Sequence, residues 1–269
     1  MSAVSSTPEF QKIRLERRDD GVRVLELDDA DKRNAIGPVM REELLSVAAE
    51  LANDTEARSL VVTGTGTSFC AGADLIALFD AEDATPAQIR ERQLSYYDSF
   101  LWLRELPYPT VAAVQGHAIG AGLNFALACD VVIAGPAARF GATFARLGLH
   151  PGGGCTWFLT ERLGGGRALH TLLLGAVLDG EEAYARGLAD VFAPDARAEA
   201  LTFATSIAAL EPSLARDIKR AVAIAADGSF EATLGFESWA QAASTYQPGV
   251  REGIRAAGRS TGAATKETK

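Results

Sequence analysis

The chain has 269 residues, of which 48% are hydrophobic and 23% charged, the composition of a globular protein with a sizeable core. Its formal net charge of −9 argues against a protein that binds nucleic acids or anionic membranes in general, because such polyanions would be repelled except at a local basic patch. A polyanionic ligand would therefore need a local group of positive side chains.

No targeting or cysteine pattern stands out. Residues 1–11 lack a cationic start followed by an apolar run, and no window approaches the roughly 18 uninterrupted apolar residues of a membrane span. We therefore expect a cytoplasmic protein. Cys70, Cys129 and Cys155 are too few and too scattered for a disulfide framework or a zinc site, so no metal is expected. Cys129 is interpreted as a small buried apolar residue.

The first third of the chain predicts strands joined by a helix and a glycine-rich loop. Residues 22–27 alternate and are β-branched enough for a strand, and residues 34–51 carry apolar side chains at helical spacing. Residues 60–63 form a short buried strand. The stretch 63–75 has loop composition, and a helix is expected to begin at residues 77–79.

A second unit of the same kind follows a long helix. That helix is predicted from Pro86 to about Leu106, where prolines end it. The next predicted elements are a strand at 110–114, a tight turn at 115–121, a helix at 122–128 and a strand at 131–134. The strands contain little polar material, which favours an α/β fold whose strands are covered on both faces.

The region after Pro194 has a helical pattern almost throughout, with helices expected at 197–210, 214–226 and 230–246. We therefore divide the chain into a core, residues 1–195, and a helical region, residues 196–269. The apolar faces of these helices exceed what a single helical layer covers, so the region is expected to pack against other subunits. The tail 258–269 is rich in small polar residues and is expected to be frayed.

Two glycine-rich turns carry the candidate chemistry. Residues 69–75 (FCAGADL) and residues 116–122 (GHAIGAG) each stand where a strand ends and a helix begins. Small residues let a ligand approach the backbone, and free N–H groups at a helix start favour a negative oxygen. One such motif alone is equally consistent with an ordinary tight turn and with a ligand-binding site. Two together can direct two N–H groups at one point, as an oxyanion hole does.

These motifs, in wording and order, resemble the signature of the enoyl-CoA hydratase/isomerase (crotonase) superfamily. The resemblance spans about residues 12–195 and also includes residues 31–35 (DKRNA), 128–130 (ACD), 139–141 (RFG) and 147–149 (LGL). It implies a spiral of β-β-α repeats with a C-terminal helical region, assembled as a trimer or a dimer of trimers.

The resemblance also implies an acyl-CoA thioester as the substrate, with coenzyme A as part of that substrate. By position, the N–H groups of Ala71 and Ala121 would hold the thioester oxygen. Lys32 and Arg33 would lie near the CoA phosphates, although a solvated charged turn is the alternative for both. The other residues that the resemblance implies for acyl-CoA binding are Gly72, Ala73, Asp74, Leu75, Gly120, Phe144 and Gly152.

The sequence departs from the family at both acid/base positions. Typical enoyl-CoA hydratases use two glutamates acting on one water, and isomerases usually keep the second glutamate. Here Asn124 stands at the first position and Phe144 at the second, four residues before Gly148. An amide cannot take a proton at neutral pH and a phenyl ring cannot transfer one. Asn124 would still be able to orient a water or the acyl group, and Phe144 would add to the apolar lining.

His150 is the strongest remaining acid/base candidate, because imidazole takes and gives protons near neutral pH and glycines follow it in the sequence. A structural role is the alternative for this single loop histidine. Weaker candidates are Asp74, His117, His170, Tyr96 and Tyr97. Residues 152–154 resemble a backbone nest able to hold a carboxylate or a water.

Two functional hypotheses follow, and a third fails. The first is enoyl-CoA hydratase-like addition of water to a 2-enoyl-CoA, or a related reaction such as isomerisation or thioester hydrolysis. The second is non-catalytic binding of acyl-CoA, which the identities of Asn124 and Phe144 favour. A dinucleotide-binding domain is excluded, because residues 64–66 lack the third glycine of the fingerprint at its required spacing.

Overall fold

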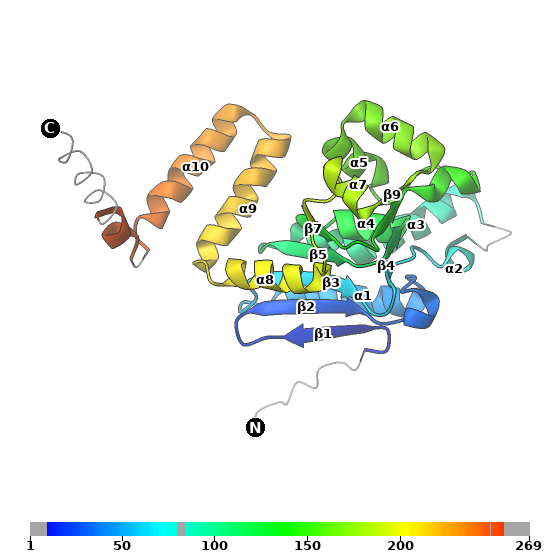
Figure 1. Ribbon diagram of the computed structural model, residues 1–269, viewed down its shortest axis with the longest axis horizontal. Coiled ribbons are helices and arrows are strands. Elements are labelled where there is room, and N and C mark those ends of the chain that lie inside the picture. The colour runs from blue at the N-terminus through cyan, green and yellow to red at the C-terminus, as the bar shows by residue number, and fades with distance from the viewer. Residues whose placement is uncertain (1–9, 80–83, 248, 256–269) are drawn as a thin grey trace, which may run out of the picture. The chain divides into compact units, whose positions relative to one another are not determined.

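The structure, a computed structural model, describes residues 10–79, 84–247 and 249–255 (Figure 1). It consists of two compact units, residues 1–208 and residues 209–269. The tail 258–269, expected to be frayed, lies outside the described residues. In the described part of the chain, no helix combines the length and the apolar character needed to cross a bilayer.

Two sheets form the first unit, and successive repeats contribute one strand to each. The strand order of the larger sheet is β1-β2-β3-β5-β7-β10, and that of the smaller one is β4-β6-β8-β9. The strands of the larger sheet are β1 (Ile13–Arg17), β2 (Val22–Leu27), β3 (Ser59–Gly64), β5 (Thr110–Val114), β7 (Val131–Ala134) and β10 (Val191–Phe192). Those of the smaller sheet are β4 (Ser68–Cys70), β6 (His117–Ile119), β8 (Arg139–Gly141) and β9 (Val177–Asp179).

The strand pairs β3/β4, β5/β6 and β7/β8 each cross from the larger sheet to the smaller one and are followed by helix, which confirms the predicted spiral of β-β-α repeats (Figure 1). The helices of this unit are α1 (Pro38–Ala52), α2 (Leu75–Phe79), α3 (Pro86–Leu101), α4 (Ala121–Leu127), α5 (Cys155–Leu163), α6 (Gly165–Leu174), α7 (Gly180–Ala185) and α8 (Ala196–Ala208). Three 3-10 turns join them: η1 (Ala30–Lys32), η2 (Trp102–Glu105) and η3 (Thr143–Leu147).

The central strands of the larger sheet are buried on both faces, which explains why their sequences are largely apolar. All residues of β2, β3 and β5 are buried. Helix α8 contacts β3 and β5, and the Ser59 hydroxyl donates a hydrogen bond to the Ala204 carbonyl at 3.0 Å. Every residue of α4 is buried, and this helix contacts strands of both sheets. Cys129 is buried, as expected.

Helix α8 therefore belongs to the first unit, and the boundary lies one helix later than the expected division after residue 195. The apolar face of α8 is used to cover the larger sheet. The second unit contains α9 (Pro212–Asp227), which begins on a Glu211 cap, and α10 (Phe230–Ser244), which begins on a Ser229 cap. These two helices contact each other, and several large apolar side chains on them are exposed: Leu214, Ile218, Val222, Phe230, Leu234 and Trp239.

The predicted elements differ from the structure mainly in the smaller sheet. The expected loop at 63–75 contains β4, and the expected tight turn at 115–121 contains β6. Each of these strands has three residues, too few for a periodic pattern, and each exists because it pairs with its neighbours in the sheet. The helix expected from residue 34 begins at Pro38, after the η1 turn.

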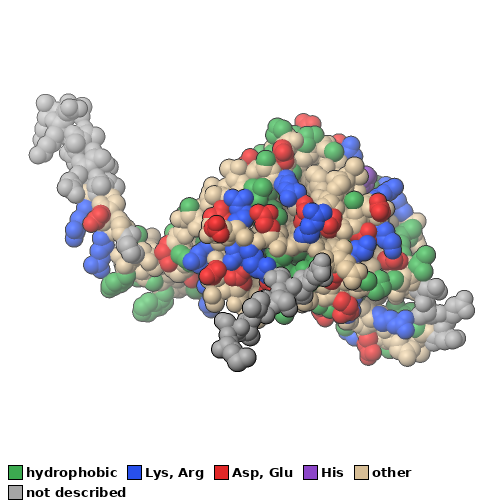
Figure 2. Space-filling view, turned by 90° about the horizontal axis from the view of Figure 1, so that it is seen from below, with side chains coloured by type: hydrophobic (Ala, Val, Ile, Leu, Met, Phe, Trp, Pro, Cys, Tyr) green, Lys and Arg blue, Asp and Glu red, His purple; other side chains and the backbone are tan. Residues whose placement is uncertain are grey.

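The surface near the β1–β2 hairpin carries charges of both signs. Figure 2 shows basic and acidic side chains interspersed on this face. Arg14 pairs with Asp28 at 2.6 Å and lies 3.6 Å from Glu26, which also pairs with Arg197. Such neutralised pairs do not form a single-sign field for a polyanion.

Asn34 connects η1 to the β3–β4 turn and is fully buried. Its Nδ2 donates to the carbonyls of Thr65, Ser68 and Phe69 at 3.0, 2.9 and 3.2 Å, and its Oδ1 accepts from the Asp29 N–H at 2.8 Å. Its φ of 56° lies in the left-handed region, which asparagine tolerates better than most residues. The side chain thereby fixes the loop that leads into β4.

We predict that Asn34→Ala lowers the free energy of unfolding by about 2–4 kcal/mol, because buried backbone groups lose their partners and alanine is strained at this φ. Asn34→Gly should cost up to about 1 kcal/mol less, since glycine removes only the strain. Asn53→Ala is the control, because the exposed side chain of Asn53 donates to the Ala49 carbonyl alone among the described residues. Denaturant unfolding measures all three, and equal losses for Asn34→Ala and Asn53→Ala would contradict the assignment.

Candidate active site

The parallel pairing of β4 with β6 places the two glycine-rich turns side by side. Ser68 lies opposite His117 and Cys70 opposite Ala118, so both strands end at the same edge of the smaller sheet. A Cβ on Gly72 would lie 2.7 Å from the Ile119 carbonyl oxygen and 3.6 Å from the Ala121 nitrogen. The backbone of the first turn is therefore in contact with the start of α4, as the sequence predicted.

The N–H groups of the first turn have different partners. Those of Ala71, Gly72 and Asp74 are already engaged: their acceptors are the Arg33 carbonyl at 2.9 Å, the Cys70 Sγ at 3.4 Å and the Ile36 carbonyl at 3.2 Å. Ala73 forms a parallel β-bridge with Ile36. In this geometry Gly72 and Asp74 make the hydrogen bonds to Ile36, and the N–H of Ala73 points away from Ile36. Within the part of the chain that the structure describes, Ala73 alone of these four keeps an uncommitted N–H group.

The N–H group of Ala71 is therefore not an available oxyanion donor, contrary to the expectation from the sequence. Ala71 lines the cavity described below, but its N–H is committed to the Arg33 carbonyl. A buried N–H that already has an acceptor at 2.9 Å gains little by exchanging it for a ligand oxygen. The donor that the first turn offers is the N–H of Ala73.

The second turn offers the N–H of Ala121. Gly120 has φ 56° and ψ −116°, a conformation that favours glycine, and its own N–H donates to the Gly141 carbonyl at 2.8 Å. Ala121 is the first residue of α4, so its N–H has no acceptor within the helix. A Cβ on Gly122 would lie 2.1 Å from the Cys70 carbonyl oxygen, so only glycine lets α4 approach β4 this closely.

A cavity of about 370 Å³ is lined by both Ala73 and Ala121, the residues that carry these two N–H groups. Most predicted site residues line it: Ala71, Gly72, Ala73, Leu75, Gly120, Ala121, Asn124, Phe144, His150 and Gly152. The structure also places there residues that the sequence analysis did not assign to the site: Leu78, Phe79, Gln93, Ile119, Thr143, Leu147, Leu149 and Pro151. Gln93, Tyr96 and Tyr97 share one face of α3 at helical spacing, but only the docking of α3 shows that this face meets the cavity.

Three predicted residues do not line this cavity. Asp74 faces a neighbouring one, and its carboxylate accepts the Ala77 N–H at 3.2 Å. Lys32 and Arg33 are exposed on and after the η1 turn. The Arg33 carbonyl nevertheless accepts the N–H of Ala71, so the backbone of this basic turn adjoins the cavity wall.

Asn124 is buried, with 1% of its surface exposed, and its amide is oriented. Its Nδ2 donates to the Gly152 carbonyl at 2.7 Å, while its Oδ1 has no hydrogen-bond partner among the described residues. It follows Ala121 by three residues on α4, so the two lie on one helix face. An oriented, unpaired acceptor in a cavity requires a donor from a ligand or a water.

Phe144, on η3, packs against the second turn. The tip of its ring would lie 3.8 Å from a Cβ on Gly120. Among the described residues that line the cavity there is no aspartate or glutamate. The cavity thus combines two backbone N–H donors with neutral polar and apolar side chains.

His150 is exposed at the cavity and has a defined tautomer when neutral. Its Nδ1 lies 2.7 Å from the Pro151 carbonyl, which can only accept, so Nδ1 carries the hydrogen and Nε2 has the free lone pair. His117 and His170 are exposed on β6 and α6 and do not line the cavity. His150 is therefore the histidine that the fold brings to this site.

Residues 152–154 form part of the cavity wall against α3. Burial raises the pKa of the Tyr97 phenol. A hydrogen bond from the Gly153 N–H to the Tyr97 hydroxyl opposes this rise. The Gly152 carbonyl accepts from Asn124. The expected nest is therefore occupied in part by the protein's own side chains.

A family model described as Enoyl-CoA hydratase/isomerase matches residues 17–259. The chain belongs to this family. It is 46% identical over 191 residues to a protein named Probable enoyl-CoA hydratase EchA14 from Mycobacterium tuberculosis, covering 71% of this chain and 73% of that one. It is 35% identical over 246 residues to a protein named Probable enoyl-CoA hydratase from Rhodobacter capsulatus, covering 88% and 91%. The crystal structure of enoyl-CoA hydratase from Bacillus anthracis superposes with a TM-score of 0.83 at 27% identity, covering 93% and 97%. The crotonase resemblance and fold are confirmed.

The geometry predicts a sharp contrast between two glycines of this crotonase-like chain. Gly72→Ala should lower the free energy of unfolding by about 2–4 kcal/mol and abolish acyl-CoA binding. The added Cβ would clash with the Ile119 carbonyl, and alanine is strained at the φ of 102° of this position. Gly148→Ala should cost only about 1–2 kcal/mol and keep binding, because nothing lies within 4 Å of its Cβ at φ 70°. Unfolding and calorimetric titration with crotonyl-CoA test both. Intact binding in Gly72→Ala would show that the two turns need not touch.

Proposed function

We propose that this protein binds acyl-CoA thioesters in the cavity and polarises the thioester carbonyl with the N–H groups of Ala73 and Ala121, in an enoyl-CoA hydratase-like addition of water to a 2-enoyl-CoA. The observation that carries this proposal is the pair of uncommitted N–H groups on two turns in contact. Charge that develops on the thioester oxygen during addition to the double bond would be stabilised there.

The carbon of the thioester that accepts water would lie near Asn124, one helical turn beyond Ala121. The free Oδ1 of Asn124 would accept a hydrogen bond from that water and hold it in place. The Nε2 of His150 would take the proton, and the imidazolium would return it to the adjacent carbon, so that one water adds across the bond. Because no paired glutamates take part, we expect a turnover about 10²- to 10⁴-fold below that of glutamate-based hydratases.

Lys32 and Arg33 would bind the CoA phosphates. Both side chains are exposed at the turn whose backbone contacts Ala71, and they supply local positive charge in a chain of net charge −9. Coenzyme A would enter as part of the substrate, with no separate cofactor.

A second candidate is non-catalytic binding of acyl-CoA. It is favoured by Phe144, whose ring packs beside Gly120 at the position where the family carries a glutamate. Such a protein would keep the thioester-binding N–H pair and lack a strong base. The two candidates differ in turnover and not in binding.

The loss of the conjugated-thioester absorbance of crotonyl-CoA distinguishes these candidates. We expect slow hydration by the wild type, at least a tenfold decrease in kcat in His150→Gln, and thioester affinity within about twofold of the wild type. His117→Gln is the matched control, because His117 is an exposed histidine outside the cavity. Binding without turnover in the wild type would select the non-catalytic candidate, and an absence of binding would contradict both.

The proposed assembly is a homotrimer or a dimer of trimers, formed through the second unit. The exposed apolar side chains of α9 and α10 include Trp239 at 80% and Val222 at 65% exposure, which is costly in water. We expect light scattering to give three or six times the 28.3 kDa chain mass, and Trp239→Glu with Val222→Glu to dissociate the assembly. A monomeric wild type at micromolar concentration would contradict this prediction.

A further inference from the structure

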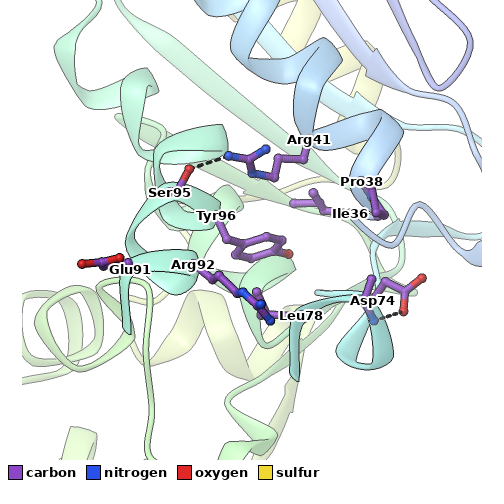
Figure 3. Close-up of a pocket in the computed structure, with 11 residues that line it drawn as sticks. Ile36, Pro38, Arg41, Asp74, Leu78, Glu91, Arg92, Ser95 and Tyr96 are labelled. Atoms are coloured by element: carbon purple, nitrogen blue, oxygen red, sulfur yellow. Dashed lines mark hydrogen bonds between the residues drawn. The ribbon is translucent and has the colours of Figure 1, made fainter. Parts of the chain in front are cut away.

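A second cavity, of about 460 Å³, adjoins the acyl cavity (Figure 3). Leu78 and Tyr96 line both cavities and so form the wall between them. The rest of the second cavity comes from the start of α1, from the segment around Asp74 and from α3. A ligand long enough to pass Leu78 and Tyr96 would extend from the first cavity into the second.

The α3 wall of this cavity carries polar side chains at regular spacing. Arg92, Ser95 and Tyr96 occupy positions i, i+3 and i+4 and therefore share a helix face. The guanidinium of Arg41, which reaches across from α1, donates a hydrogen bond to the Ser95 hydroxyl (Figure 3). It also pairs with Glu42. Two guanidinium groups from different helices thus border one cavity.

Tyr96 is 5% exposed, and its hydroxyl has no hydrogen-bond partner among the described residues. Figure 3 shows its ring extending from α3 among the other residues that line the cavity. Burial raises the pKa of this phenol well above its ordinary value, so the hydroxyl stays protonated and can donate. A buried donor without an acceptor indicates a missing ligand group or a water.

Neither acidic side chain of this cavity, Asp74 or Glu91, forms an ion pair with Arg92 or a hydrogen bond with the Tyr96 hydroxyl, although the Asp74 carboxylate adds negative charge near that hydroxyl. Glu91 points away from the cavity in Figure 3, and the carboxylate of Asp74 accepts the Ala77 N–H. Arg92 forms no ion pair with any described residue. The Arg92 guanidinium and the Tyr96 hydroxyl are both donors, and a carboxylate satisfies two donors at once.

We propose that the second cavity binds a carboxylate at the far end of the acyl chain, so that the preferred substrates are thioesters of CoA with dicarboxylic acids. Arg92 and Tyr96 donate to the distal carboxylate. The apolar part of the chain lies between Leu78 and the first cavity. This inference rests on the proposed function, because the thioester end must occupy the first cavity.

The test compares two CoA thioesters of equal chain length by calorimetric titration of the full-length protein. Octanoyl-CoA ends in a methyl group and suberyl-CoA ends in a carboxylate. We expect suberyl-CoA to bind the wild type at least tenfold more tightly, and this preference to fall about tenfold in Arg92→Gln and in Tyr96→Phe. Arg90→Gln is the matched control, since Arg90 is an exposed arginine of the same helix that lines neither cavity, and it should keep the wild-type preference.

Four results would overturn the inference. Equal affinities of the two thioesters for the wild type would show that the distal carboxylate is not recognised, while leaving thioester binding intact. A preference that persists in both Arg92→Gln and Tyr96→Phe would place the recognition elsewhere. Binding of free suberate or inorganic phosphate that depends on Arg92, with no preference between the thioesters, would identify a site for free anions. If neither thioester binds, the proposed function fails and this inference with it.

Discussion

The close parallel pairing of β4 with β6 is the constraint on which the site depends. Each strand has three residues, yet their pairing brings the ends of two separate repeats to the same edge of a sheet. The approach is possible because Gly122 has no Cβ to collide with the Cys70 carbonyl, and because Gly72 adopts a φ of 102° next to Ile119. Substituting either glycine would separate the turns that carry Ala73 and Ala121.

The hydrogen bonds within the fold determine which backbone N–H groups remain available to a ligand. A folded backbone pairs nearly all of its buried N–H groups, so the few left over at a cavity are informative. The first turn commits three of its four N–H groups to Arg33, Cys70 and Ile36, and α4 leaves the N–H of Ala121 at its first position. Donors held by the fold need no reorganisation when charge develops on a substrate oxygen, and this is the main source of their effect in catalysis.

The same cavity offers hydrogen-bonding groups and, among its described lining residues, no carboxylate. Asn124 is held by Gly152 and presents an unpaired oxygen, while Phe144 adds apolar surface beside Gly120. Tyr96 presents a second unpaired group, on the wall shared with the neighbouring cavity. Unpaired buried groups are costly, so a ligand that satisfies them gains affinity over one that does not. In the proposed complex, specificity for the acyl group therefore rests on neutral donors and acceptors near the thioester and on Arg92 at the far end of the acyl chain.

The sequence by itself determined the fold class, the family and most of the residues that line the cavity, including Ala121, Asn124 and His150. It succeeded where the pattern is local, as in the apolar runs of β2, β3 and β5 and in the glycines that mark the two turns. Only the tertiary structure decided that Ala73 and not Ala71 keeps a free N–H, because the partner of Ala71 is Arg33, 38 positions earlier in the sequence. Only the docking of α3 against α1 and the first turn placed Arg92 and Tyr96 at a cavity with Arg41. Periodicity shows which residues share a helix face, whereas what that face meets depends on contacts between segments far apart in the chain.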